Sequence, residues 1–84
     1  MEIKNDGYIL SEFANGELIS TQQFGVYGEA EEAMLEEVSK VMNDYNDEIP
    51  TYKPIVDIKK NCAYFGGLKT KVQLYISELP SSQE

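Results

Sequence analysis

The chain has 84 residues and a net charge of −8, from 15 acidic side chains against 7 lysines, with one cysteine and no His or Arg. A chain of this length forms one domain with a thin core and has little room for an enclosed substrate cavity. The lack of His excludes Ser–His and Cys–His nucleophile pairs, and a single cysteine excludes an internal disulfide and a thiolate zinc cluster. We therefore expect a protein that is not an enzyme and needs no cofactor or metal.

The first third of the chain predicts a β-hairpin. Two apolar-rich runs flank Asn15-Gly16. Asn-Gly is the strongest short signal for a two-residue turn, because both turn positions need a positive φ. Such a turn places Phe13 opposite Leu18 and Ile9 opposite Gln22.

The segment from Glu29 to Tyr45 predicts an amphipathic helix that begins after an N-cap at Gly28. Acidic residues in its first turn suit the positive end of the helix dipole, and apolar residues recur at helical spacing. On the opposite side, Glu36 and Lys40 are spaced for a favourable i,i+4 ion pair. The apolar stripe consists of Ala30, Met34, Val38, Val41 and Tyr45, with Leu35 and Met42 beside it.

The last third predicts a second antiparallel unit. Residues 68–77 alternate apolar and polar side chains, as a half-buried strand does. The run 56–64 keeps the same period until Lys60 breaks it, so Lys60-Asn61 is either a bulge or a turn that splits the run in two. Pro50 and Pro54 delay regular pairing after the helix.

These elements predict an α+β fold: a small antiparallel sheet in ββαββ order, with a fifth strand if the 56–64 run divides, and one amphipathic helix packed on one face. We expect a single compact domain over residues 1–79 and a frayed tail over residues 80–84. The predicted core consists of Phe13, Leu18, Met34, Val38, Val41, Val72, Leu74 and Ile76.

The sequence also favours one compartment. Cys62 is the only cysteine, and no segment has the character of a signal peptide or a membrane span. We therefore expect a cytoplasmic protein, or one that acts in the host cytoplasm if it is viral.

The negative charge is concentrated in one region. Residues 29–48 carry eight acids and one lysine, a local charge of −7, whereas residues 49–84 carry five lysines and three acids, a local charge of +2. Such a helix is either an ordinary solvated face or a row of charges that attracts a basic groove. The candidate protein-binding residues are Glu29, Glu32, Glu36, Glu37, Asp44, Asp47, Glu48 and Tyr52, with Tyr27 and Tyr45 also at the margins of the helix.

In size, acidity and lack of catalytic groups, the whole chain resembles the small inhibitor proteins that phages make against host nucleic-acid enzymes, the anti-CRISPR proteins among them. The resemblance includes no motif. It implies an inhibitor or nucleic-acid mimic that binds a basic nucleic-acid-binding protein, such as a bacterial defence nuclease. No direct binding of nucleic acid or membrane is expected.

Two alternatives remain open at this point. One is a small structural or assembly protein that forms a homodimer through its sheet edges and uses its acidity for solubility. The other is a nucleic-acid binder in which aromatic side chains stack on bases, although the net charge of −8 and the lack of Arg oppose it. That binder would use Lys59, Lys60, Lys69 and Lys71 together with Tyr64, Phe65 and Tyr75.

Overall fold

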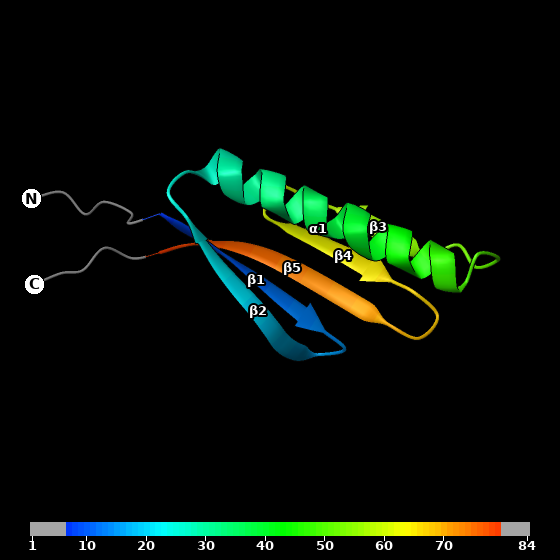
Figure 1. Ribbon diagram of the computed structural model, residues 1–84. Coiled ribbons are helices and arrows are strands. Elements are labelled where there is room, and N and C mark those ends of the chain that lie inside the picture. Colours follow the sequence, from blue (N-terminus) through cyan, green and yellow to red (C-terminus); the bar gives the residue numbers. More distant parts are fainter. Residues whose placement is uncertain (1–6, 80–84) are drawn as a thin grey trace, which may run out of the picture.

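The computed structural model describes residues 7–79, which form a five-stranded antiparallel sheet with one helix on one face (Figure 1). This confirms the predicted α+β class. The predicted tail, residues 80–84, lies outside the described residues. The elements in chain order are β1 (Tyr8–Ala14), β2 (Glu17–Phe24), α1 (Tyr27–Glu48), β3 (Ile55–Ile58), β4 (Cys62–Gly66) and β5 (Lys71–Glu78).

The strands lie in the order β2-β1-β5-β4-β3. Helix α1 leaves one edge strand, β2, and leads across the sheet to the other edge strand, β3 (Figure 1). The first and last strands of the chain, β1 and β5, therefore pair at the middle of the sheet.

The chain runs ββαβββ and not ββαββ, so the fifth strand that the sequence left open is present. The run 56–64 divides at a turn, in which the Lys59 amide donates a hydrogen bond to the Cys62 carbonyl at 2.8 Å. Lys60-Asn61 is thus part of a turn between two strands and not a bulge within one.

The hairpin turn is confirmed. Asn15 and Gly16 have φ values of 52° and 89°, the positive values that the turn requires. Phe13 pairs with Leu18 as predicted, but Glu12 pairs with Ser20, so Ile19 is an extra residue in β2. Because of this bulge, Ile9 lies opposite Gln23 and not opposite Gln22.

Helix α1 begins two residues earlier than predicted, with Val26 and not Gly28 as the N-cap. Tyr27 explains the earlier start. Its single hydroxyl proton is shared between the Lys60 carbonyl and Asn61 Oδ1, the latter at 2.9 Å, so it holds the first helical turn against the β3–β4 turn.

The helix also continues three residues past the predicted end, to Glu48. The Tyr45 side chain is only 6 % exposed and packs edge-on against Phe65, with ring centroids 5.3 Å apart. Its hydroxyl accepts a hydrogen bond from the Leu68 amide. A Cβ on Gly67 would lie 2.4 Å from the Tyr45 ring, so a glycine there leaves room for this contact.

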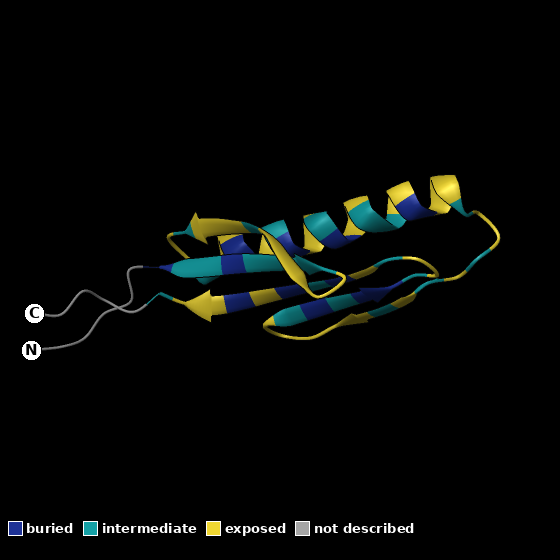
Figure 2. Cartoon of the chain, turned by 90° about the horizontal axis from the view of Figure 1, so that it is seen from below, coloured by how far each residue is buried: buried dark blue, intermediate teal, exposed yellow. Residues whose placement is uncertain are grey.

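The core lies between α1 and the sheet face that it covers (Figure 2). Of the predicted core, Phe13 and Val41 are half-buried and Leu18 is 56 % exposed. Phe13 and Leu18 face away from the helix, because side chains alternate along a strand and Leu10 faces it. The buried residues are Leu10, Ala30, Met34, Val38, Tyr45, Ala63, Phe65, Val72, Leu74 and Ile76, which confirms five of the eight predicted.

Two truncations test this division of the sheet into a covered and an open face. Leu74→Ala should lower the free energy of unfolding by about 2–4 kcal/mol, because Leu74 is 1 % exposed and its removal leaves a cavity. Leu18→Ala, the same chemical change on the open face, should stay within about 0.5 kcal/mol of wild type. Urea unfolding of both variants measures the difference, and equal losses would show that the faces are misassigned.

Candidate protein-binding surface

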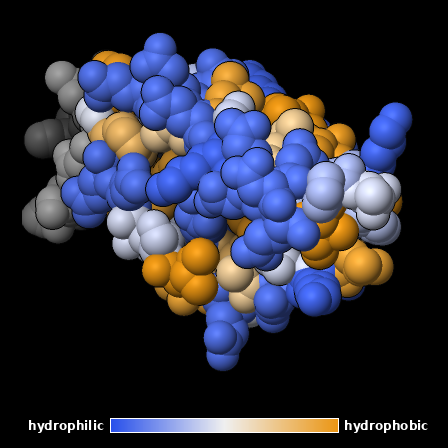
Figure 3. All heavy atoms as spheres, turned by 45° about the vertical axis from the view of Figure 1, so that its right-hand side comes forward, coloured by the Kyte–Doolittle hydropathy of each residue, from blue (hydrophilic) through white to orange (hydrophobic). Residues whose placement is uncertain are grey.

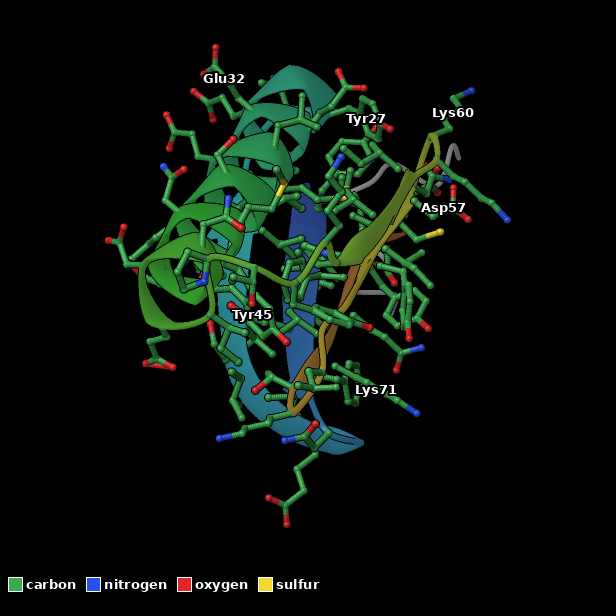
Figure 4. The ribbon with its side chains drawn as sticks, turned by 90° about the vertical axis from the view of Figure 1, so that its right-hand side faces the viewer. Tyr27, Glu32, Tyr45, Asp57, Lys60 and Lys71 are labelled. Atoms are coloured by element: carbon green, nitrogen blue, oxygen red, sulfur yellow. The ribbon has the colours of Figure 1, made fainter. Side chains whose placement is uncertain are left out.

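The outer side of α1 carries most of the predicted binding residues. Figure 4 shows Glu32 pointing away from the sheet, on the far side of the helix from Asp57 and Lys71. At 1.5 Å per residue, Glu29 and Glu48 are about 29 Å apart along the axis. We call the exposed carboxylates of this helix the acidic surface; they are Glu29, Glu31, Glu32, Glu36, Asp44, Asp47 and Glu48.

None of these carboxylates is held in an ion pair with a described residue. The ion pair found within residues 7–79 joins Lys59 Nζ and Asp57 Oδ2 at 3.8 Å, on the β3 side of the sheet. The predicted pair between Glu36 and Lys40 is not formed. The acidic surface is therefore available to an external cation without loss of an internal bridge.

An apolar side chain interrupts the acidic surface. Leu35, predicted beside the buried stripe, is 41 % exposed. It lies in a shallow, open hollow of about 520 Å³ along α1, lined by Glu32, Leu35, Glu36, Ser39, Lys40, Asn43 and Asp44. In the view of Figure 3, hydrophilic side chains likewise cover most of the surface, with separate apolar patches between them.

Sequence reasoning missed two members of this region, Glu31 and Leu35. Both lie on the same flank of the helix, because residues four apart are neighbours on a helix surface. The spacing was visible in the sequence, but the boundary between buried and exposed positions depends on how α1 is rotated over the sheet.

Two predicted site residues do not join the acidic surface. Glu37 is half-buried, and its side chain is hydrogen-bonded to Glu12 of β1, on the sheet face that α1 covers. Tyr52 is half-buried as well, with its ring centroid 6.0 Å from that of Tyr45. Both side chains pack within the domain. Tyr27 and Tyr45 also use their side chains within the domain, because their hydroxyls form hydrogen bonds with the Lys60 carbonyl and the Leu68 amide.

The Glu12 and Glu37 carboxyls form the most unusual polar contact in the described residues. Burial under the helix raises the pKa of Glu12 above its ordinary value of 4.5. The negative charge of Glu37 and the hydrogen bond between the two side chains raise this pKa further, and the positive charge of Lys40 partly offsets the rise.

The residues of the nucleic-acid-binding alternative are brought together only in part: Lys59, Tyr64 and Tyr75 line one small hollow of about 90 Å³. Phe65 is 1 % exposed and lies in the core, so it cannot stack on a base. Lys60 and Lys71 lie toward opposite ends of the sheet (Figure 4), each in or beside a different turn. Of the four lysines, only Lys59 lines the hollow with Tyr64 and Tyr75, and its charge is paired with Asp57 there.

Two further functions have no matching feature in the described part of the chain. Across residues 7–79, His, Cys, Asp and Glu side chains nowhere gather in threes that could hold a metal ion. Over the same range, no helix has both the length and the apolar character that crossing a membrane requires.

No protein-family model, curated protein or solved structure matches this chain. Its function therefore has to be inferred from the geometry and charge of its own residues.

The Glu12–Glu37 contact predicts a pH-dependent stability. The pKa of Glu12 is raised in the folded state. The favourable contribution of this carboxyl to the free energy of unfolding is therefore fully present below pH 4.5, and it is lost as pH rises through the folded-state pKa. Glu12→Gln should therefore raise the melting temperature at pH 7, and the gain should shrink near pH 4.

Glu36→Gln is the matched control, because it removes the same charge from an exposed position on α1. Thermal melts of wild type and both variants at the two pH values give the comparison. If Glu12→Gln and Glu36→Gln shift the melting temperature equally at pH 7, the effect is one of net charge and the half-buried Glu12–Glu37 contact has no special role.

Proposed function

We propose that this protein is a non-enzymatic inhibitor that binds a basic nucleic-acid-binding protein through the acidic surface of α1, as a mimic of nucleic-acid charge. The observation that carries the proposal is that seven exposed carboxylates lie along one 22-residue helix with no ion pair to a described residue.

The charge density of α1 supports mimicry. A helix of 22 residues is about 33 Å long, so its seven exposed carboxylates give about one negative charge per 5 Å of axis. One strand of B-DNA carries one phosphate per about 3.4 Å of axis. A groove that binds a phosphate backbone would therefore meet a similar row of charges on α1.

The hollow around Leu35 adds an apolar contact within the charged surface. A leucine that enters a partner's groove excludes water from the neighbouring charge pairs, and charge pairs at an interface are worth more when they are desolvated. Glu32 and Glu36 flank this side chain and line the same hollow. The centre of the proposed interface is therefore the segment from Glu32 to Glu36.

The partner class follows from the charge and from the resemblance to phage inhibitors. It is a basic protein of the bacterial cytoplasm that binds nucleic acid, such as a defence nuclease. The single, free Cys62 agrees with a reducing compartment. If the protein is viral, this compartment is the host cytoplasm.

The test compares charge reversal on and off the proposed interface. Proteins retained from bacterial lysate by the immobilised wild type are identified, and the most abundant basic nucleic-acid-binding protein is then purified for titration calorimetry. The double variant Glu32→Lys, Glu36→Lys should weaken its binding by about 2–5 kcal/mol. The same variant should also reduce the salt dependence of binding.

The control is the double variant Glu17→Lys, Glu78→Lys. It changes the net charge by the same amount, at two exposed positions outside α1. It should retain most of the affinity, and both variants should melt close to wild type. Equal losses of affinity would reduce the proposal to non-specific charge attraction, and unchanged affinity of the α1 variant would remove α1 from the interface.

A further inference from the structure

Strand β2 is an open edge of the sheet. Its eight residues, Glu17–Phe24, include no proline, and the seven from Leu18 to Phe24 carry no charge. Six of the eight residues are exposed. A long, exposed edge strand without such protection is a template for pairing with another strand.

The other edge strand is protected. Strand β3 has only four residues and follows directly after Pro54. Its Asp57 side chain forms an ion pair with Lys59. Short length, proline and charge are the devices that keep an edge from pairing. The two edges of the sheet thus differ in whether they can accept another strand.

The hydrogen-bond pattern shows which groups of β2 point outward. The Asn15 amide donates to the Lys71 carbonyl, and the Leu79 amide donates to the Gly7 carbonyl. Odd-numbered residues of the β1 region therefore bond to the β5 side, and even-numbered residues bond to β2.

The partners of the even-numbered residues follow from the register. Leu10 lies opposite Gln22 and Tyr8 opposite Phe24, so Gln22 and Phe24 bond inward to β1. Thr21 and Gln23 then direct their amide and carbonyl groups away from the sheet. Within residues 7–79, no backbone hydrogen bond outside the strand ladders uses these groups.

We infer that β2 pairs antiparallel with β2 of a second copy of this chain, which joins two sheets into one of ten strands. The outward groups set the register. Thr21 lies opposite Gln23 of the second copy and exchanges hydrogen bonds with it, and Gln22 lies opposite its own equivalent at the two-fold axis. A two-fold interface uses the same surface on both copies, so each residue near the axis lies opposite the same or a neighbouring residue of the other copy. Because this part of β2 is neutral, no like charges lie opposite one another.

The placement of the acidic helix removes the main obstacle to this pairing. A chain with a net charge of −8 repels its own copies unless the charges stay apart. Helix α1 lies over β1, β5 and β4 as well as β2, so it is centred near β5, two strands from the edge. With strands about 4.8 Å apart, the two helices would be more than about 20 Å apart, over twice the Debye length of about 8 Å at physiological salt.

Sedimentation equilibrium from micromolar to millimolar concentration tests the inference. The wild type should form a dimer, and Thr21→Pro should raise the dimer dissociation constant about tenfold or more, because it removes an outward donor from both copies. Ile58→Pro is the matched control on β3. Its residue is also exposed, and its amide also points outward because Lys59 bonds inward, so dimerisation should persist.

A charge exchange at the axis keeps the test decisive if a proline variant does not fold. Gln22→Lys and Gln22→Glu each put two like charges opposite one another and should be monomeric at concentrations where wild type is dimeric. An equal mixture of the two variants should recover a dimer. The inference is overturned if wild type remains monomeric at millimolar concentration, or if each Gln22 variant dimerises alone as well as wild type does.

The inferred dimer can be tested separately from the proposed function, because the β2 pairing does not use α1. The charge-reversed variant Glu32→Lys, Glu36→Lys should keep the dimer. Loss of the dimer in that variant would also count against β2 as the interface.

Discussion

The packing of one helix on one face of the sheet is the contact on which the rest of the structure depends. Ala30, Met34, Val38 and Tyr45 are all less than about a tenth exposed, and they supply the helix side of the core. Ala30 is fully buried, and its small side chain lets the helix lie close to the strands. Residues 7–79 form no second helix, so no described helix covers the opposite face of the sheet.

The same contact determines where the charge goes. Once the apolar stripe faces the sheet, the remaining positions of α1 face solvent, and seven of its eight acidic residues are exposed there. Glu37 is the exception, because it lies on the flank next to β1 and meets Glu12. Packing thus converts a local excess of acidic residues into a surface of one sign.

The path of the helix also determines the edges of the sheet. Because α1 carries the chain from one edge to the other, β1 and β5 occupy the middle, and β2 has one neighbouring strand among residues 7–79. The acidic surface and the β2 edge then lie on different elements. A dimer through β2 would present two acidic helices, and such a bivalent arrangement can bind a partner with two basic sites more tightly than either copy alone.

Features that depend on residues near one another in sequence were predictable. The Asn15-Gly16 turn, the apolar stripe of α1 and the alternation over residues 71–77 each rest on a local pattern, and each is confirmed. The predicted start of that strand at residue 68 is wrong, because β5 begins at Lys71 and Leu68 is 60 % exposed. Most of the acidic positions of α1 followed from the same helical period, with Glu31 and Glu37 as the exceptions.

Features that depend on distant contacts were not predictable. The helix limits depend on how Tyr27 and Tyr45 dock on turns that come later in the chain. The exposure of Leu18 depends on which sheet face α1 covers, and the Ile19 bulge shifts the register of the hairpin. The contact between Glu12 and Glu37 joins two elements whose relative placement no local pattern reveals.

An acidic surface that serves binding should contribute nothing to the stability of the fold beyond the first helical turn, where Glu29 meets the helix dipole. The most direct test is the melting temperature of the triple variant Glu32→Gln, Glu36→Gln, Asp44→Asn, three exposed positions beyond the first helical turn, at low and high salt. At low salt the variant should melt at or above the wild-type temperature, because like charges have been removed, and the difference should close at high salt. A clearly lower melting temperature would show that these carboxylates hold the structure together, and would contradict the account.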